Sequence, residues 1–556
     1  MDASTSRTPL LNPAGVGIRN ELLDVGMPYV LGPRLHMRGL DAVNTVVKNY
    51  EFCFIPFVLG VRKSQKDIEA DYDHLRNLLD SSEYWDKAQD EVRYLFSYVC
   101  DKFPIKPNEN VHDRRDGAKR DAPQGERAPA AGDAPQGEQV LHYRLKERTL
   151  ISLGFGRKAR WDNGGFRNGA GKWCSWKGTK HICIHIDSID LYVFKTSVNI
   201  LQIEMHFDTA DAMDIPSNLF HLKNISSYRS SGIIPQSNSW TCEELRAYAQ
   251  FPEKRGITFD EITRFLIKHI DDGLRPELLF YANEGCGKMN ILAYAELPMD
   301  TAAEEVTRKL FYLGNCYNNS YIYSSSHCIP SNAHWQSPDI AWGYSSEALA
   351  CVTLCGQAIV RAAKGSGAHH SMGEWEHRRF IKRTFIKNVK SNYRFMYLIL
   401  LHQKYAYYLL LTRLGAGQDK DVEVLEDYKS QLETLRTNFA FSRVSEAAQY
   451  QQLYAKLSEE FKLADIDRDV NDPLVTLTQL KHDEEERQDR RRERDMNHAL
   501  ALLAVLSIIS CVCDGVSLFG ASLEWFVVAL IVTVVPIAVF TRSLWLRDWT
   551  SDQSKD

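Results

Sequence analysis

Two long apolar runs stand close together near the C-terminal end of the 556-residue chain. The first covers residues 499–519. The second covers residues 525–540 and can be extended by 544–546. A helix of about 20 apolar residues is long enough to cross the ~30 Å hydrocarbon core of a bilayer. Because only residues 520–524 separate the runs, the connection must be a tight turn. The pattern predicts a two-helix transmembrane hairpin over residues 499–546, followed by a tail at 547–556.

Arginines flank this hairpin on one side of the membrane. Residues 520–524 contain neither Lys nor Arg, so the positive-inside rule places both ends of the hairpin in the cytoplasm. Residues 1–25 lack the continuous apolar segment of a signal peptide. We therefore expect a multi-pass protein of the inner (plasma) membrane with cytoplasmic N- and C-termini. The predicted cytoplasmic basic ring consists of Arg490, Arg491, Arg492, Arg494, Arg542 and Arg547.

The N-terminal third of the chain predicts an α/β segment and a low-complexity insertion. In residues 1–105, the apolar run 52–59 indicates a buried strand, although Pro56 favours an edge position or a bend. Helical spacing follows at Ile68, Tyr72, Leu75 and Leu79. Residues 106–139 repeat Asp-Ala-Pro-Gln-Gly-Glu at 121–126 and 133–138 and contain almost no apolar side chains. Such a segment cannot bury enough surface to form a core, so we expect it to be disordered.

Residues 140–300 are predicted to be rich in strands. Apolar positions alternate from Ile182 to Ile186, and they continue from Val198 to Phe207 with one slip that suggests a bulge. Residues 258–261 form a capping box that opens a helix. Residues 278–282 and 291–297 resemble two strands that pair around the intervening loop.

Residues 301–470 are predicted to be helical. The apolar stretch 393–411 is nearly long enough to span a membrane, but it carries Arg394, His402 and Lys404. Charged groups at mid-bilayer cost about 2.5–3.5 kcal/mol each, so a buried helix of the soluble body is the better interpretation. Asp472 and Pro473 then resemble an N-cap and first turn, which predicts a helix break there. A stalk helix at 473–498 would continue into the first span, about 70 Å in all.

These segments together define the expected fold class, which is α+β. A mixed α/β cytoplasmic body would be followed by a long stalk helix and a C-terminal transmembrane hairpin. The formal net charge of −5 argues against a nucleic-acid partner. The enzyme signals are weak, because residues 285–288 lack P-loop spacing and neither His181/His185 nor His369/His370 has a second ligand pair. We therefore expect no enzymatic activity, no catalytic residues and no bound metal centre.

The first apolar run carries a polar stripe. Ser507, Ser510, Asp514 and Ser517 step by three and four residues, which places them on one helical face. An ionisable residue inside a span usually faces a cavity or a helix bundle. A ring of identical hairpins could turn this face toward a shared pore, with a carboxylate ring and an apolar constriction. The predicted pore-lining residues are Asn497, Leu500, Leu503, Ser507, Ser510, Asp514 and Ser517. The alternative is that the serines bond to their own helix and Asp514 lies in the interface.

This arrangement resembles the CorA-type magnesium channels. Residues 519–522 (Phe-Gly-Ala-Ser) stand where that family has aromatic-Gly-Met-Asn and match the aromatic and the glycine. Residues 542–547 are similar to the family's basic Trp-Leu tail. The resemblance covers residues 473–547 and implies a homopentamer whose first span lines the pore. It also implies Mg²⁺ or another divalent cation as transported or regulatory ion, which Ser522 in place of Asn puts in question. The corresponding outer-mouth residues are Phe519, Gly520, Ala521, Ser522 and Glu524.

Three hypotheses follow for the function. The first is a CorA-like homo-oligomeric cation channel gated by its cytoplasmic body, with the lipid bilayer and other copies of the chain as partners. The second is a membrane effector of a bacterial antiviral (CRISPR-type) system, because CorA-like proteins of this size occur there; this resemblance implies a small nucleotide messenger as ligand. The third is a non-conducting, membrane-anchored scaffold.

Overall fold

The structure is a computed structural model. It describes residues 47–59, 64–105, 138–155, 161–163, 166–167, 173–174, 183–222, 233–235, 237, 239–248, 257–278, 289–297, 301–317, 341–345, 348–353, 356–362, 384–415 and 422–518, with single positions between 524 and 542. The chain divides into Met1–Thr45, which lies outside these residues, and Val46–Asp556, which is described below. All but the last two positions of the low-complexity segment 106–139 also lie outside the described residues.

Twelve of the described strands form one sheet, in which only the pair β11–β14 is parallel. Its main order is β12 (Ala341–Ser345), β13 (Ala348–Thr353), β14 (Gly356–Ala362), β11 (Asn290–Leu297), β1 (Asn49–Leu59), β8 (Val198–Asp208), β7 (Cys183–Phe194), β3 (Val140–Leu145) and β2 (Trp85–Lys87). Further pairs add β10 (Pro276–Leu278) to β1, β4 (Trp161–Asn163) to β7, and β9 (Ile233–Pro235) to β4. A separate small sheet pairs β5 (Phe166–Arg167) with β6 (Trp173–Cys174).

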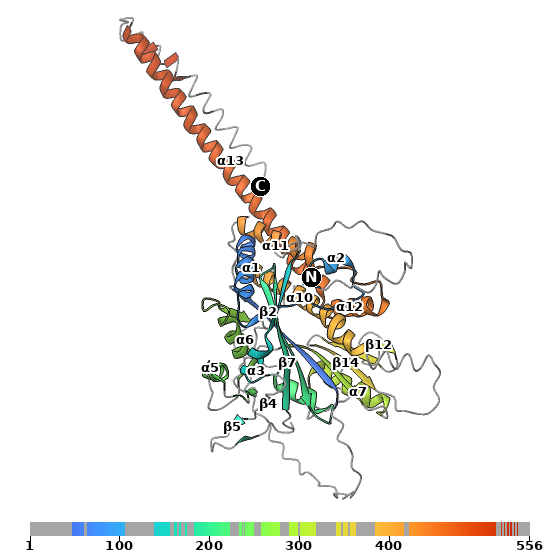
Figure 1. Ribbon diagram of the computed structural model, residues 1–556. Coiled ribbons are helices and arrows are strands. Elements are labelled where there is room, and N and C mark those ends of the chain that lie inside the picture. Colours follow the sequence, from blue (N-terminus) through green and yellow to red (C-terminus); the bar gives the residue numbers. More distant parts are fainter. Residues whose placement is uncertain are drawn as a thin grey trace, which may run out of the picture. The chain divides into compact units, whose positions relative to one another are not determined.

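Helices pack on both faces of the sheet and create two hydrophobic cores. The first core contains side chains of α1 (Gln65–Asp80), α3 (Glu147–Ser152), α4 (Asp214–Leu222), α5 (Trp240–Tyr248), α6 (Phe259–Lys268) and α7 (Ala303–Asn315). The second contains side chains of α2 (Ser97–Cys100), α9 (Ile386–Asn388), the π-helix η2 (Val389–Tyr393), α10 (Arg394–Gly415), α11 (Val422–Phe439), α12 (Ala448–Glu460) and α13 (Leu463–Leu518). Figure 1 shows α10, α11, α12 and α13 of this second group in orange and red. The predicted mixed α/β class is therefore confirmed for the described body.

The strand β1 lies inside the sheet, so the expectation of an edge position or bend at Pro56 is wrong. β8 pairs with β1 on one side from Glu51 to Val58. On the other side, β11 pairs with β1 as far as Phe54, and β10 begins at Phe57. Pro56 falls in the gap between these two partners, where its missing N–H removes no ladder hydrogen bond. The predicted pairing of 278–282 with 291–297 is not found at Leu278, because β10 and β11 both pair with β1; residues 279–282 lie outside the described residues.

Both faces of the central strands are buried, which explains another irregularity in the sequence. In β8, Leu201, Ile203 and Met205 belong to the first core, whereas Val198 and Ile200 belong to the second. The irregular alternation between 198 and 207 therefore arises because apolar side chains on opposite faces of β8 pack in different cores. It is not a bulge, since β8 pairs regularly with β1 there. The bulge lies in the neighbouring strand β7, between Ile186 and Ser188.

Two helices were predicted correctly, one from the capping box at Thr258 and the other from the apolar spacing between Ile68 and Leu79. Thr258 caps α6 through Glu261, and the buried residues of α1 are the four predicted ones. The region 301–470, by contrast, is not helical throughout. Strands β12, β13 and β14 occupy residues 341–362 and extend the sheet beyond β11. Their short runs of small and β-branched residues contain no alternation that would have marked them as strands.

Helix α10 is a buried helix of the body, as the sequence analysis concluded. Nearly all of its side chains are buried, including Arg394, His402 and Lys404. His402 Nε2 lies 2.7 Å from Thr196 Oγ1, and its ring stacks on Phe194 with centroids 3.8 Å apart. Burial lowers the pKa of His402 to about 3, so this histidine is neutral in the folded protein.

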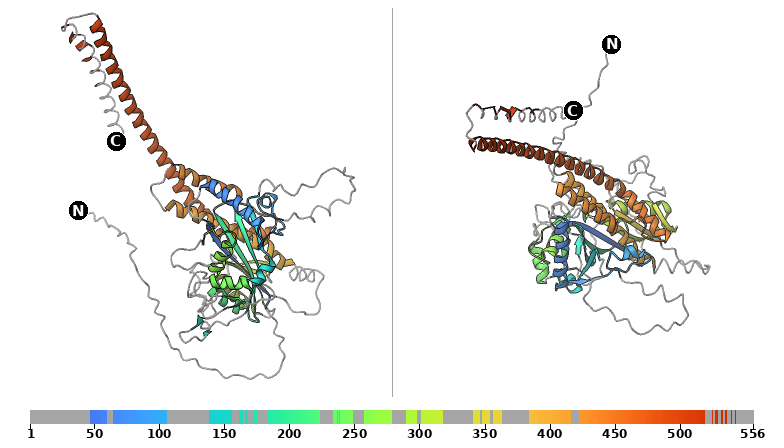
Figure 2. Two further views of the ribbon diagram at one scale, coloured as in Figure 1. Left: turned by 60° about the vertical axis from the view of Figure 1, so that its left-hand side comes forward. Right: turned by 90° about the horizontal axis from the view of Figure 1, so that it is seen from above.

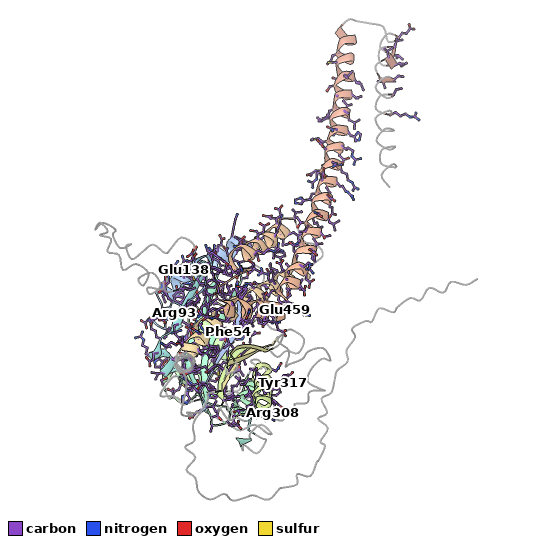
Figure 3. The ribbon with its side chains drawn as sticks, turned by 90° about the vertical axis from the view of Figure 1, so that its right-hand side faces the viewer. Phe54, Arg93, Glu138, Arg308, Tyr317 and Glu459 are labelled. Carbon is purple, nitrogen blue, oxygen red and sulfur yellow. The ribbon has the colours of Figure 1, made fainter. Side chains whose placement is uncertain are left out.

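Helix α13 runs without interruption for 56 residues, about 84 Å. The predicted break at 471–473 is therefore wrong, because Pro473 lies inside the helix. Val470 and Leu474 on either side of it are buried in the second core, and this packing holds the helix together where the proline removes a backbone hydrogen bond. From His482 to Leu500 every side chain is exposed. Figure 2 shows the ribbon of α13 from two further directions, and Figure 3 draws side chains along this helix.

Candidate functional site

A polar pocket of about 800 Å³ opens at one end of the sheet. It lies where β1 begins, where β3 and β8 end, and where the bulge of β7 interrupts the ladder. Its lining combines three cationic side chains (two Lys and one Arg) with two aromatic rings, a histidine and two carboxylates. The residues are Val47, Lys48, Asn49, Tyr50, Arg144, Leu145, Glu147, Leu150, Asp187, Ser188, His206, Phe207 and Lys390.

The β-bulge places two of these side chains. Asp187 is the extra residue between the pairs Ile186–Met205 and Ser188–Glu204. Bulges redirect side chains and are frequent beside functional sites. Here Asp187 accepts a hydrogen bond from His206, with 2.7 Å between Oδ2 and Nδ1. The ring of His206 also stacks on His185, one of the four histidines that were considered as metal ligands from the sequence, with centroids 4.7 Å apart.

Arg144 presents part of its guanidinium group to the pocket. Its Nε donates to Oδ1 of the fully buried Asp190 at 2.7 Å, while about half of the arginine side chain is exposed. Burial alone would raise the pKa of Asp190, but the hydrogen bonds and charges of His142 and Arg144 outweigh it and hold that pKa well below its usual value. An arginine fixed in this way is well placed to receive an anion.

A chain of buried polar contacts leads from this arginine across the sheet to α10. His142 Nε2 lies 2.9 Å from Asp190 Oδ1, and its Nδ1 lies 3.4 Å from Oδ2 of Asp90. Asp90 forms an ion pair with Arg394 at the start of α10. Burial tends to raise the pKa of Asp90, yet the charges of Arg394 and His142 lower it overall. Arg394 also donates to Tyr192 at 2.6 Å and to Gln202 at 2.7 Å.

Lys390 forms a second and shorter connection between the pocket and the helical layer. It belongs to the π-helix η2, which runs directly into α10. Its Nζ lies 3.6 Å from the ring centroid of Tyr50 and pairs with Glu204 on β8. π-helical segments are rare and are often found at functional sites. A change in the pocket that moves Lys390 would therefore act on η2 and α10 together.

Glu51 is an unusual buried carboxyl group beside Asn49 and Tyr50 on β1. It is fully buried, and among the described residues neither of its carboxyl oxygens has a hydrogen-bond partner. Burial raises its pKa well above the usual value, Asp187 raises it further, and Lys390 opposes the rise. The protonated, neutral form is therefore the one that the folded protein favours.

Aromatic and polar contacts join α10 and α11 to the beginning of α13. Tyr397 on α10 packs against Phe461, which lies two residues before α13, with centroids 5.8 Å apart. Arg436 on α11 holds Asp467 on α13 through two hydrogen bonds of 2.8 and 2.9 Å. The buried residues Leu463, Ile466, Val470 and Leu474 complete this contact. The pocket and α13 are thus connected through one packed helical layer.

The predicted pore-lining residues all lie on α13, so the structure places them on a single helix. Asn497, Ser507, Ser510 and Asp514 are exposed, as are Leu500 (56%) and Leu503 (59%). Ser517 belongs to the helix, but its side chain lies outside the described residues. From Leu500 to Ser517 the spacing is a strict alternation of three and four residues, which keeps these positions on one face of a supercoiled helix.

The outer mouth and basic ring are described only in part. Phe519, Gly520, Ala521, Ser522 and Arg547 lie outside the described residues, whereas Glu524 and Arg542 are helical and exposed. Arg490, Arg491, Arg492 and Arg494 are exposed on α13. Among the described residues, α13 is the one helix whose length and composition suit a membrane span. In the same part of the chain, no group of three or more His, Cys, Asp or Glu is placed to hold a metal ion.

Comparisons with protein-family models, with curated proteins and with solved structures gave no match to this chain.

The pocket was not predicted from the sequence. Its members come from six separate elements and form no local motif in the sequence. One signal was present in the sequence, because Asp187 and Asp190 are two carboxylates in a largely apolar strand from 184 to 194. A buried carboxylate in such a strand requires a partner from elsewhere in the fold. That partner, Arg144, could not be assigned without knowing that β3 lies beside β7.

Proposed function

We propose that the protein is a homo-oligomeric cation channel whose cytoplasmic body controls a pore formed by α13. The observation that carries this proposal is the continuity of α13. Its first turns are part of the hydrophobic core of the body, and its last turns expose a dense row of large apolar side chains. Leu502 (65%), Leu506 (60%) and Ile508 (43%) belong to this row, which would be unfavourable in water and is favourable in lipid.

The polar stripe on the same helix gives the reason to prefer a pore over a simple anchor. A lone anchor gains nothing from Ser507, Ser510 and Asp514 on one face, because polar groups in the hydrocarbon region are unfavourable there. In a ring of copies, this face would meet the axis and the apolar positions would meet lipid. Residues 525–540 would form the second span, and the arginines on both sides would keep the body and the tail in the cytoplasm.

The pocket would be the binding site for a ligand that controls such a channel. A ligand bound by Arg144 and Lys390 would act on α10 through Asp190, His142 and Asp90, and also directly through η2. Helix α10 packs on the beginning of α13, so a shift in α10 would reach the membrane segment without a flexible joint. A small anionic ligand of nucleotide size suits the volume and the exposed guanidinium of Arg144. The antiviral-effector hypothesis would then differ only in which ligand is sensed.

Reconstitution in liposomes tests this proposal directly. Purified protein should form one oligomeric species in detergent and should conduct K⁺ or Mg²⁺ when inserted into vesicles loaded with an ion-sensitive dye. Arg144→Ala should leave the oligomer intact and alter the response to added anionic ligands. A monomeric protein, or an oligomer without cation flux under any ligand condition, would favour the scaffold hypothesis instead.

A further inference from the structure

The exposed part of α13 between the body and the apolar run that begins at Ala499 carries charges of opposite sign on different sides of the helix. Between Leu480 and Met496, over residues 481–495, it contains no apolar side chain, so it lacks the seam through which helices normally pack together. From Glu486 to Arg494 its charges are nevertheless sorted, apart from Arg492, whereas one turn earlier Asp483 and Glu484 lie on the side that the arginines take. The basic stripe, defined as Arg487, Arg490, Arg491 and Arg494, occupies one side of the helix. The acidic stripe, defined as Glu486, Asp489 and Glu493, occupies another.

The angle between the two stripes follows from helix geometry. At about 100° per residue, the centre of the basic stripe lies about 120° around the helix from the centre of the acidic stripe. The acidic stripe also shares a register with the polar face of the membrane segment. Glu486, Asp489 and Glu493 continue through Met496 to Leu500 with the same alternation of three and four residues. In a supercoiled helix, the acidic stripe and Asp514 therefore point to the same side, and the basic stripe points to a different one.

The basic stripe also lies at a suitable height. Ala499 is the first residue of the apolar run. Arg494 lies five residues before it, about 7.5 Å along the helix, and Arg491 and Arg490 lie about 12–14 Å before it. The polar headgroup layer extends roughly 5–8 Å beyond the hydrocarbon core on each side. Arginine side chains can extend toward that layer while their charge stays in water. Arg487 is one turn further away, at about 18 Å, near the limit set by a screening length of about 8 Å.

We infer that the basic stripe is a docking surface for the anionic headgroups of the cytoplasmic leaflet. The inference rests on the membrane insertion assumed in the proposed function, but it does not depend on ion conduction. Lipid phosphates would hold the basic side of α13 outward, while the acidic side is repelled from the same surface. Because the acidic stripe and Asp514 share a side, lipid binding would turn the polar face of the membrane segment away from lipid and toward the symmetry axis.

The contacts within the helix do not oppose this role. Arg490 pairs with Glu486 one turn away, and each side chain of the pair is more than half exposed. Arg492, which lies outside the basic stripe, is 3.7 Å from Asp489. Exposed pairs of this kind add little stability and exchange readily for another anion. A basic residue close to an anionic membrane surface contributes about fivefold to binding, so four arginines can select anionic lipid strongly.

The experiment measures which lipids accompany the full-length protein. The protein is reconstituted in equal amounts of dioleoylphosphatidylcholine and dioleoylphosphatidylglycerol, excised in polymer discs, and its lipids are quantified by mass spectrometry. We expect phosphatidylglycerol to be enriched at least several-fold over the bulk membrane, and less so in high salt. The variant with Arg487→Gln, Arg490→Gln, Arg491→Gln and Arg494→Gln should lose most of this enrichment. The matched control with Glu486→Gln, Asp489→Asn and Glu493→Gln should keep or increase it.

Two results would overturn the inference. Equal enrichment in the arginine variant and the wild type would show that the stripe does not contact headgroups. Loss of the oligomer in the arginine variant, with the enrichment retained by the remaining protein, would show that the stripe binds the acidic stripe of a neighbouring copy instead. Protein that enters the discs and shows the expected enrichment, yet conducts no ions, would refute the channel and leave this inference standing.

Discussion

The pairing of Arg394 with Asp90 should be among the strongest single contributions to the stability of the body. Both side chains are buried, at 6% and 1% exposure, and the arginine also donates to Tyr192 and Gln202. Arg394→Met keeps a long unbranched side chain but leaves Asp90 charged, buried and without its cation. Removing one partner of a buried ion pair costs about 3–5 kcal/mol. Against a total stability of about 5–15 kcal/mol, this is a severe loss.

Unfolding in urea, followed by tryptophan fluorescence and far-UV circular dichroism in a mild detergent, measures the effect. Arg436→Met serves as the matched control, because its partner Asp467 is partly exposed and such pairs contribute about 0–1 kcal/mol. Combining Arg394→Met with Asp90→Asn removes the orphaned charge and should recover at least 1 kcal/mol of the loss. If Arg394→Met were no more damaging than Arg436→Met, or if the double variant were additive, the buried network would not couple the sheet to α10.

The same network predicts how the body responds to acid. The pKa of Asp90 is lowered in the folded state, so its contribution to stability is present above its unfolded pKa of about 3.9 and disappears as the pH falls through the folded pKa. Wild-type protein should therefore lose stability as the pH falls below about 4. The acid-dependent part of this loss should be smaller in Arg394→Met, where the lowered pKa is no longer maintained.

Three further predictions concern other parts of the chain. Burial raises the pKa of Glu51, so its contribution is present below the unfolded pKa and is lost as the pH rises; Glu51→Gln should gain stability relative to wild type between pH 5 and pH 8, and a constant difference would contradict this. Gln488→Pro lies in the exposed part of α13 and should cost about 3 kcal/mol of helix stability, leaving an oligomer whose flux no longer responds to ligand; an unchanged response would mean that the helix is passive. A reporter that is active only in the cytoplasm should be active when fused after Asp556, and an inactive fusion in correctly inserted protein would refute the hairpin topology.

The spacing of apolar residues along the chain predicted individual helices correctly, but it did not predict which strands lie beside one another in the sheet. The spacing of Ile68, Tyr72, Leu75 and Leu79 gave α1, and the polar centre of 393–411 correctly argued for a buried helix. Both conclusions depend only on neighbours within one element. The interior position of β1 did not follow from its sequence, because Pro56 is tolerated only through a gap between β10 and β11. That gap is a property of the assembled sheet.

The candidate pocket was unpredictable for a related reason. Asp90, the pair His142 and Arg144, and Asp190 come from three segments, each about 50 residues from the next, and the sequence does not show which of them are partners. Their relationship arises when β3 and β7 become neighbours and α10 covers them. At Pro473 the error was different, because the sequence predicted a helix break where the structure has a continuous helix. A rule that holds for an isolated helix was outweighed by the burial of Val470 and Leu474 in the second core.

The central claim is that the polar face of α13 lines a cation pathway, and the reversal potential across a planar bilayer tests it most directly. With a tenfold KCl gradient, wild-type protein should give a potential close to that of a cation-selective pore. Asp514→Asn keeps the size and polarity of the side chain but removes the charge, so the potential should move toward zero and the conductance should fall, with the oligomer intact. Val512→Asn, on the opposite face by its spacing, should impair assembly without changing selectivity. An intact Asp514→Asn oligomer with wild-type reversal potential and conductance would contradict the claim.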